Sequence, residues 1–241
     1  MSGHSKWNNI KNTKAKADAQ RSNIFTKIGR EISVAVKAGG PNPDTNSKLY
    51  DVIQKAKQNN MPNDTIMRSI KKASGEGNNE NYEEIIYEGY GAGGSAVIVK
   101  CLTDNKNRTA GDVRHLFDKF GAGLGTTNSV AYMFDIKGVF IVEKTADINE
   151  ETLMMQALEC GAEDFEVYDD CYVIYSEREQ FHVVKKALEE VSIVLAQASI
   201  DYVAKSPMVL GEEYEEKFSR LIDELEDLDD VQEVYHNCED K

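Results

Sequence analysis

The chain has 241 residues, of which 41% are hydrophobic and 29% are charged, and its formal net charge is −14. This balance is typical of globular proteins and excludes a wholly disordered chain, and no stretch approaches the roughly 18 apolar residues of a membrane-spanning helix. The polar, basic N-terminus lacks the apolar run of a secretory signal, so we expect a cytoplasmic protein with no membrane partner.

The first 21 residues contain few large apolar side chains and cannot bury enough surface to fold alone. We expect this tail to be mobile until an acidic ligand orders it. Residues 1–75 contain 14 Lys and Arg against 5 Asp and Glu, a net charge of +9, whereas residues 76–241 contain 14 against 37, a net charge of −23. A basic module joined to an acidic body favours a polyanion partner for the basic part.

Three short helices are predicted after the tail, and they form a small bundle. The first has Ser22 as its N-cap and is stopped by Gly39, Gly40 and Pro41. Its apolar residues recur every four positions and form one stripe, made of Ile24, Ile28, Ile32 and Val36. The second helix spans about 46–59. Pro62 and Asn63 open the third, Gly75 and Gly77 end it, and the run GEGNNEN at 75–81 is a linker.

From residue 82 the period of the hydrophobic pattern changes from that of helices to that of strands. Strands are predicted at 82–90 and 95–102, a helix at 109–120 and a third strand at about 129–135. A βαββαβ unit follows, which is the ferredoxin-like order. Its strands are at 138–143, 164–168, 171–176 and 198–204, and its helices are at 150–160 and 179–191. A helix at 212–227 and a strand at 231–236 come last.

The last helix and strand have no partner in the βαββαβ unit, but they would complete the domain before it. The predicted fold class is therefore α+β, with an N-terminal helical bundle and two α+β domains, the ferredoxin-like one inserted into the other. The expected domains are 1–77, 82–136 with 207–238, and the insert 137–205. Two α+β domains in series are the alternative.

The basic N-terminal region is the first candidate site, because seven Lys and Arg and one acid lie between Lys6 and Arg30. Contacts from such cations to phosphates release counterions, and this term dominates non-specific nucleic-acid binding. Trp7 offers a flat ring on which a base can stack. The alternative is a solvated basic tail that aids solubility, with Trp7 packed onto the body.

The segment LTDNKNRT at 102–109 is the second candidate, because it leaves a strand and enters a helix. Backbone amides at a helix N-terminus attract anions, and Lys106 and Arg108 add positive charge. Asp, Asn and Thr are also ordinary turn and cap residues, which is the alternative. The glycines in GYGAGG at 89–94 and GAGLG at 121–125 match no nucleotide-binding pattern and indicate tight turns.

Enzyme chemistry has little support in the sequence. The four cysteines are 59, 11 and 67 residues apart, so no CxxC pair indicates a zinc or redox site. Asp104 beside Lys106 and Arg108 is the closest approach to a phosphoryl-transfer site, but no second carboxylate stands at a metal-binding spacing. We therefore expect no enzyme activity, no metal, no cofactor and no small-molecule substrate.

Six motifs resemble the YebC family, and they appear in the expected order from Ser2 to Asn237: SGHSKW, IFTKIGREI, YEGYGAGG, LTDNKNRTAGDVRH, SVAYMF and DLDDVQEVYHN. Ala92 departs from the pattern, because many relatives have proline there. The resemblance implies a three-domain protein around a concave surface. Bacterial members are described as DNA-binding transcriptional regulators, a mitochondrial relative is a translational activator for a cytochrome oxidase subunit, and other members are proposed to act on stalled ribosomes.

The resemblance also implies where nucleic acid binds. In the N-terminal region the expected contacts are Lys6, Trp7, Lys11, Lys14, Lys16, Arg21, Lys27 and Arg30, and in the loop they are Asn105, Lys106, Asn107 and Arg108. We expect a DNA-binding transcriptional regulator. A translation factor that binds rRNA or the ribosome is the alternative, and a protein-interaction scaffold built on the acidic domains is a third hypothesis. The sequence leaves the oligomeric state open.

Overall fold

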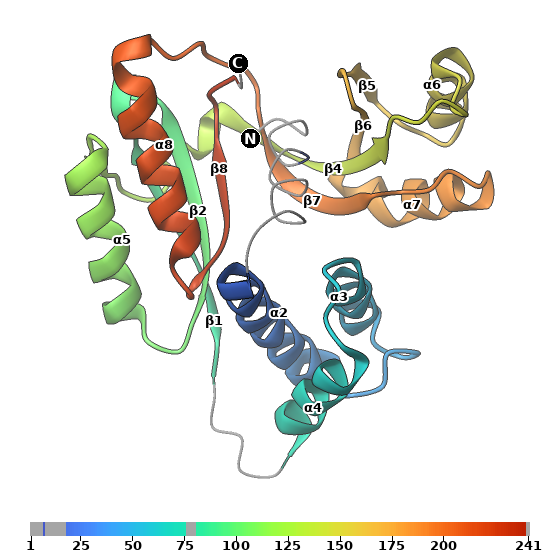
Figure 1. Cartoon of the computed structure of the whole chain (residues 1–241), viewed down its shortest axis with the longest axis horizontal. Coiled ribbons are helices and arrows are strands. Elements are labelled where there is room, and N and C mark those ends of the chain that lie inside the picture. Colours follow the sequence, from blue (N-terminus) through green and yellow to red (C-terminus); the bar gives the residue numbers. More distant parts are fainter. Residues whose placement is uncertain (1–6, 8–17, 76–80, 240–241) are drawn as a thin grey trace. The chain divides into compact units, whose positions relative to one another are not determined.

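The structure is a computed structural model that describes residue 7, residues 18–75 and residues 81–239 (Figure 1). Of the predicted tail, residues 1–21, only Trp7 and residues 18–21 are therefore among the described residues. The chain divides into two compact units. One, the helical unit, consists of Asn12–Ser129 and Gly211–Val234. The other, the inserted unit, consists of Val130–Leu210 with the chain ends Met1–Lys11 and Tyr235–Lys241.

The helical unit begins with three helices that share one apolar core: α2 (Asp18–Gly39), α3 (Ser47–Gln58) and α4 (Asn63–Ser74). The stripe from Ile24 to Val36 packs into this core as predicted. Ser22 is not the N-cap, because it lies inside α2, where its carbonyl accepts a hydrogen bond from Thr26. Asn46 caps α3 by accepting the Leu49 N–H, so the second helix begins where the pattern indicated.

The sheet of the helical unit has the strand order β3-β1-β2-β8. An antiparallel hairpin forms its centre, with strands β1 (Glu83–Tyr90) and β2 (Ala96–Thr103). Gly93 and Gly94 both have positive φ in the turn between them, which explains two of the glycines in the segment 89–94. At Gly89 a side chain would stand 2.5 Å from the Phe117 ring, so glycine lets helix α5 (Lys106–Phe120) approach the strand closely.

The outer strands of this sheet come from distant parts of the chain. Strand β3 (Gly123–Leu124) pairs with β1, and β8 (Val231–His236) neighbours β2. Helix α8 (Glu212–Asp227) precedes β8 and packs beside α5 (Figure 1). The chain thus returns to its first sheet after the whole second sheet has been made.

The predicted strand at 129–135 is wrong. Ala131–Met133 form a short 3-10 helix, and Phe134 already begins a strand of the other sheet. The alternation of Val130, Tyr132 and Phe134 imitates a strand, but Val130 and Phe134 are buried whereas Tyr132 is 65% exposed. The third strand of this part of the chain is instead the short strand β3, which pairs with β1.

The inserted unit contains the second sheet, with the order β5-β6-β4-β7 and antiparallel neighbours throughout. Its elements are β4 (Phe134–Glu143), α6 (Glu150–Glu159), β5 (Asp164–Val167), β6 (Cys171–Glu177), α7 (Phe181–Glu190) and β7 (Gln197–Ala204). This is the predicted βαββαβ order, so the α+β fold class with a ferredoxin-like insert is confirmed. Among the described residues, no helix combines the length and apolar character needed to cross a membrane.

The two faces of the second sheet have different partners. Side chains on one face of the sheet, such as Phe140 and Ile174, form a core with helices α6 and α7. Side chains on the opposite face, such as Ile141 and Val173, form a second apolar cluster with Trp7. Because strand side chains alternate between faces, both faces of β4 and β6 had to be apolar to build these two clusters.

Candidate nucleic-acid interface

The candidate residues of the N-terminal region have different environments. Lys6, Lys11, Lys14 and Lys16 lie outside the described residues. Arg21 is exposed near the beginning of α2. Trp7, Lys27 and Arg30 are not exposed, and their partners show what each of them does in this structure.

Trp7 is 1% exposed and packs in the apolar cluster of the inserted unit. Its neighbours are Val139, Ile141, Cys171, Val173 and Tyr175. An indole ring is a large apolar surface, and burial against aliphatic side chains removes that surface from water. In this arrangement no ring face is available to a base, so the structure corrects the stacking role expected for Trp7. Packing onto the body, the alternative, is what the structure shows.

Lys27 lies against the end of α8. Its ammonium group donates a hydrogen bond to the carbonyl oxygen of Glu226 at 2.5 Å. Burial lowers the pKa of Lys27, although the nearby carboxylates of Glu226 and Asp227 act in the opposite direction. The Lys27 ammonium group is thus largely buried and links α2 to α8. In this position it is less available to an external phosphate.

Arg30 holds the turn between α8 and β8. Its Nη1 lies 2.6 Å from Oδ1 of Asp230 and 2.5 Å from the carbonyl oxygen of Asp229, and it also donates to Leu102 O at 3.2 Å. The side chain is only 13% exposed. Arg30 is therefore an internal ion-pair partner here, and the contact to nucleic acid expected from the sequence would require these bonds to break.

The loop at 102–109 is organised as a helix cap. Asn105 accepts the Arg108 N–H at 3.2 Å, and its own N–H donates to Oγ1 of Thr103 at 2.9 Å. Helix α5 begins at Lys106, three residues before the predicted start at 109, because this cap extends it. Asn105 is thus a helix cap, which is the alternative interpretation of this loop.

The charged side chains of the same loop have acidic partners. Arg108 donates to Oδ1 of Asp104 at 2.9 Å and to Oδ2 of Asp230 at 2.8 Å. Hydrogen bonds to Asp230 and Asp104 raise the pKa of Arg108. Lys106 forms an exposed ion pair with Glu83, and Asn107 is exposed. The structure brings Asn105 and Arg108 into one network and leaves Lys106 and Asn107 at its edge.

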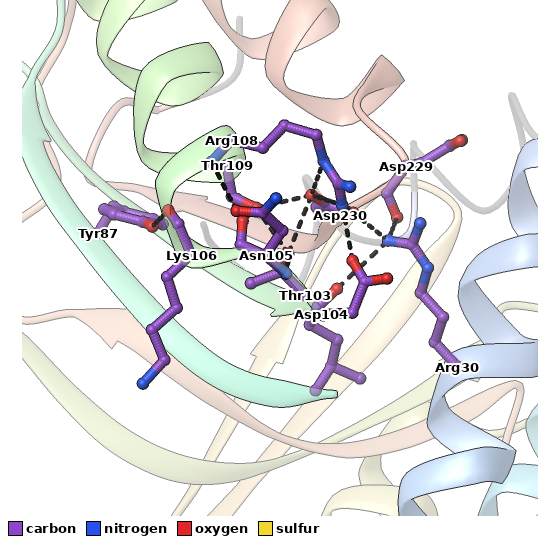
Figure 2. A network of polar contacts seen from close by, with 11 residues as sticks. Arg30, Tyr87, Thr103, Asp104, Asn105, Lys106, Arg108, Thr109, Asp229 and Asp230 are labelled. Atoms are coloured by element: carbon purple, nitrogen blue, oxygen red, sulfur yellow. Dashed lines mark hydrogen bonds and ion pairs between the residues drawn. The ribbon is translucent and has the colours of Figure 1, made fainter. Parts of the chain in front are cut away.

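Asp230 is the centre of that network, and sequence reasoning missed it (Figure 2). Arg30 approaches it from α2 and Arg108 from α5, while the Thr109 hydroxyl donates to Oδ2 at 2.6 Å. Thr103 Oγ1 lies 3.2 Å from the same oxygen. The residue is 7% exposed. Three elements of the helical unit therefore meet on one carboxylate.

The protonation of Asp230 is controlled by these donors. Burial by itself would raise the pKa of this carboxyl, but the hydrogen bonds from Thr109, Arg108 and Arg30 outweigh burial and hold the pKa below its usual range. The carboxylate stays charged and forms ion pairs with both arginines. No local signal in the sequence marks Asp230, because its partners Arg30 and Arg108 are 200 and 122 residues away along the chain.

The outer face of α4 carries cations of another kind. Arg68, Lys71 and Lys72 are exposed there, opposite the buried Ile66 and Ile70. Neither Arg68 nor Lys71 has an ion-pair partner within residues 18–75 and 81–239. Exposed Lys37, Lys48 and Lys57 add to the charge of the same three-helix bundle. Residues 18–75 contain 10 Lys and Arg against 5 Asp and Glu, a net charge of +5.

Known proteins match the chain from end to end. Residues 5–76 match the family model described as the TACO1/YebC protein N-terminal domain, and residues 82–238 match the TACO1/YebC second and third domain. A protein of Acetivibrio thermocellus named "probable transcriptional regulatory protein" is 58% identical over 98% of both chains. A protein of Hathewaya histolytica with the same description is 55% identical over 99% of this chain and 97% of its own.

A solved structure agrees with these matches. The crystal structure of a conserved hypothetical protein from Aquifex aeolicus superposes with a TM-score of 0.85, at 44% identity and 93% coverage of each chain. The family models, the sequence relatives and the solved structure each cover both units of the chain. By these comparisons, the chain belongs to the TACO1/YebC family.

Proposed function

We propose that this protein is a DNA-binding regulator of transcription that grips the phosphate backbone with the exposed cations of its helical bundle. The names of its relatives support a regulatory role. The observation that carries the proposal is the outer face of α4, where Arg68, Lys71 and Lys72 project from a basic bundle in a chain of net charge −14. A local basic surface on an acidic protein concentrates polyanions at that surface.

Such a surface supplies affinity more readily than sequence selectivity. Each phosphate neutralised by a Lys or Arg releases counterions and contributes about 0.9 to the salt dependence of binding to duplex DNA. Sequence would have to be read by base contacts or through the shape of the DNA.

Structured RNA, as in a ribosome, is the alternative ligand, and one feature of α3 favours it. Tyr50 is 50% exposed, and Lys57 lies seven residues later on the same side of the helix. An exposed aromatic ring beside a cation can stack on an unpaired base, which RNA loops offer and duplex DNA does not.

The test measures binding of labelled duplex DNA and of a labelled structured RNA by fluorescence anisotropy over a range of salt concentrations. The double variant Arg68→Gln/Lys71→Gln should weaken binding at low salt by about tenfold and reduce the salt slope by up to about 1.8. The matched control is Arg178→Gln/Lys186→Gln, which removes one exposed Arg and one exposed Lys from the inserted unit. The control should bind like the unaltered protein.

A companion variant tests the N-terminal segment and the beginning of α2, with Lys11, Lys14, Lys16 and Arg21 all changed to Gln. Further loss of affinity in this variant would place part of the interface there. Tighter binding of duplex DNA than of RNA supports the DNA-binding regulator, and the reverse supports the ribosome or rRNA alternative. Unchanged affinity and salt slope in both the α4 variant and the companion variant would contradict the proposal.

A further inference from the structure

Helix α6 of the inserted unit is apolar on two sides. Its inner side carries Leu153 and Ala157, which are buried in the core that the helix forms with the sheet. Its outer side carries three large apolar side chains that are 39%, 61% and 49% exposed, those of Met154, Met155 and Leu158. A surface helix normally turns polar residues to solvent, and a helix that is apolar all round is normally buried. The outer side of α6 therefore differs from an ordinary solvated face.

Helix α7 packs on the same face of the sheet but has an ordinary outer side. Lys186, Glu189 and Glu190 are exposed there, together with Val183. On α6 the exposed apolar side chains instead adjoin one another, because Leu158 lies one helical turn beyond the two methionines. Isolated apolar residues are common on protein surfaces, whereas contiguous ones mark interaction sites. The outer side of α6, called the α6 face below, is therefore a candidate docking surface.

The chain around the α6 face is strongly acidic. Residues 143–170 contain ten Asp and Glu and one Lys, a net charge of −9. Glu151 precedes the three apolar side chains by three, four and seven residues, so it lies in the same row of the helix. Glu159 follows Met155 by four residues and lies beside this row. Both carboxylates are exposed, and neither has an ion-pair partner among the residues that the structure describes.

This combination of apolar and acidic side chains restricts the chemistry of a partner. Nucleic acids and anionic membranes have the same sign of charge as the segment and are repelled by it. A second copy that docked through its own α6 face would place the same carboxylates opposite one another. A segment that presents apolar side chains flanked by Lys or Arg satisfies both features. Methionine suits such a surface, because its flexible, polarizable side chain adapts to the shape of a partner.

We propose that the α6 face is a docking site for a basic amphipathic helix of a partner protein. Apolar side chains of that helix would cover Met154, Met155 and Leu158, while its Lys or Arg side chains would pair with Glu151 and Glu159. Such a helix is recognised by apolar residues spaced three and four positions apart. The site does not rest on the proposed function, because it has the opposite charge from the cations of α4 and belongs to the other unit. It would join a protein partner to a chain whose bundle binds nucleic acid.

A labelled model peptide tests the docking site on the full chain. The probe is a helix of leucine and lysine of about five turns, with leucine at positions i, i+3, i+4 and i+7. Its binding is measured by fluorescence anisotropy beside two control peptides, one with the same residues in scrambled order and one with glutamate in place of lysine. Both controls should bind about tenfold more weakly or less. Equal binding of the scrambled peptide would overturn the site, because charge alone would then explain the attraction.

The apolar contribution is tested by the triple variant Met154→Gln/Met155→Gln/Leu158→Gln. Glutamine is a good helix former, so α6 should persist, and circular dichroism checks this. Affinity for the leucine–lysine peptide should fall by about tenfold or more, because the apolar contact area is lost. Binding of duplex DNA and of RNA should not change. The matched control is Met67→Gln, which alters an exposed methionine on α4 and should leave peptide binding as it is. Unchanged peptide affinity in the triple variant would overturn the proposal.

The charge contribution is tested by the double variant Glu151→Gln/Glu159→Gln. Exposed ion pairs are individually weak and screened by salt. Peptide affinity should therefore fall by only about threefold at low salt, and its salt dependence should become smaller. The control is Glu212→Gln/Glu213→Gln, which removes two exposed carboxylates from α8 of the helical unit. Equal losses in the two double variants would show that net charge, and not the α6 face, attracts the peptide.

Photo-crosslinking in cells identifies the chemistry of the natural partner and does not require the triple variant to fold. The photoreactive amino acid p-benzoylphenylalanine takes the place of Met155, or of Val209 as a control that is 67% exposed in the same unit. Mass spectrometry then sequences the crosslinked peptide. A peptide of another protein with Lys or Arg beside apolar residues at helical spacing, found only from position 155, is the expected result. A crosslink to a second copy of the chain or to nucleic acid, or no crosslink above the control, would overturn the proposal. Absence of DNA and RNA binding by the unaltered protein would instead overturn the proposed function alone.

Discussion

Two groups of cations in the helical unit look alike in the sequence but differ in the folded protein. Arg30 and Arg108 share the buried carboxylate of Asp230, and Lys27 is drawn against the end of α8. Arg68 and Lys71 project from the outer face of α4. A buried cation that is paired with a carboxylate, such as Arg30, must break that pair before it can bind a phosphate. Arg108 shares the same carboxylate, but its side chain is 47% exposed and lies at the surface end of the network. Arg68 and Lys71 therefore add to a polyanion-binding surface at the least cost. Charge counted along a sequence therefore overestimates the charge offered to a ligand.

The largest effect should come from removing the centre of the internal group. Asp230→Ala leaves Arg30 without its main partner in a poorly hydrated position, and we expect the free energy of unfolding to fall by about 3–5 kcal/mol. Urea denaturation followed by circular dichroism measures this loss. Asp229→Ala is the matched control, because Arg30 bonds to the backbone carbonyl of Asp229 and not to its side chain. Equal losses in the two variants would show that the Asp230 carboxylate is not the centre of the network.

His236 is a third kind of basic side chain, because burial keeps it uncharged. His236 is 6% exposed, and burial lowers its pKa from 6.5 to about 3. Between these values the unfolded chain binds a proton that the folded protein does not, so stability falls as the pH is lowered from about 6.5 toward 3. The slope is at most about 1.4 kcal/mol per pH unit.

Urea midpoints measured between pH 7 and pH 4.5 test the role of His236. His236→Gln should flatten the decline in this interval. His182→Gln is the control, because His182 is exposed on α7. An unaltered slope in the His236 variant would mean that this side chain is not kept neutral by burial. Loss of the Asp230 ion pairs should appear only at lower pH, near and below the usual carboxyl range, because the pKa of Asp230 is lowered.

A smaller loss is expected when one neutral donor is removed from the network. Thr109→Val keeps the shape of the side chain but deletes the hydroxyl that lies 2.6 Å from Oδ2 of Asp230. The free energy of unfolding should fall by about 1–3 kcal/mol, because a buried acceptor loses a partner. Thr126→Val, at an exposed turn, should change it by less than about 0.5 kcal/mol in the same denaturation assay.

The smallest effect is expected at the edge of the network. Lys106 and Glu83 are each 59% exposed, so their ion pair is screened by water and salt. A double-mutant cycle with Lys106→Gln and Glu83→Gln should give a coupling energy below about 1 kcal/mol. A coupling energy comparable to the loss in Asp230→Ala would mean that the exposed Lys106–Glu83 pair stabilises the protein as much as the buried ion pairs of Asp230 do.

Local patterns predicted most of the secondary structure. The apolar stripe of α2, the apolar strands β4 and β6 and the order of the ferredoxin-like unit are all confirmed. The error at 129–135 arose because a short 3-10 turn between two buried residues has the same alternation as a strand. The start of α5 was placed too late because Asn105 extends the helix beyond its apolar residues.

The amino-acid sequence alone determined the helices, the strands and the uneven division of charge. The hydrophobic periods, helix caps and glycine turns that specify helices and strands act over only a few residues. The partners of the charged and aromatic side chains required the tertiary structure. Asp230 meets Arg108 across 122 positions of the chain and Arg30 across 200, and Trp7 meets a sheet that begins at Phe134. Such contacts depend on how whole elements pack, and no local pattern records which cation or ring will be buried there.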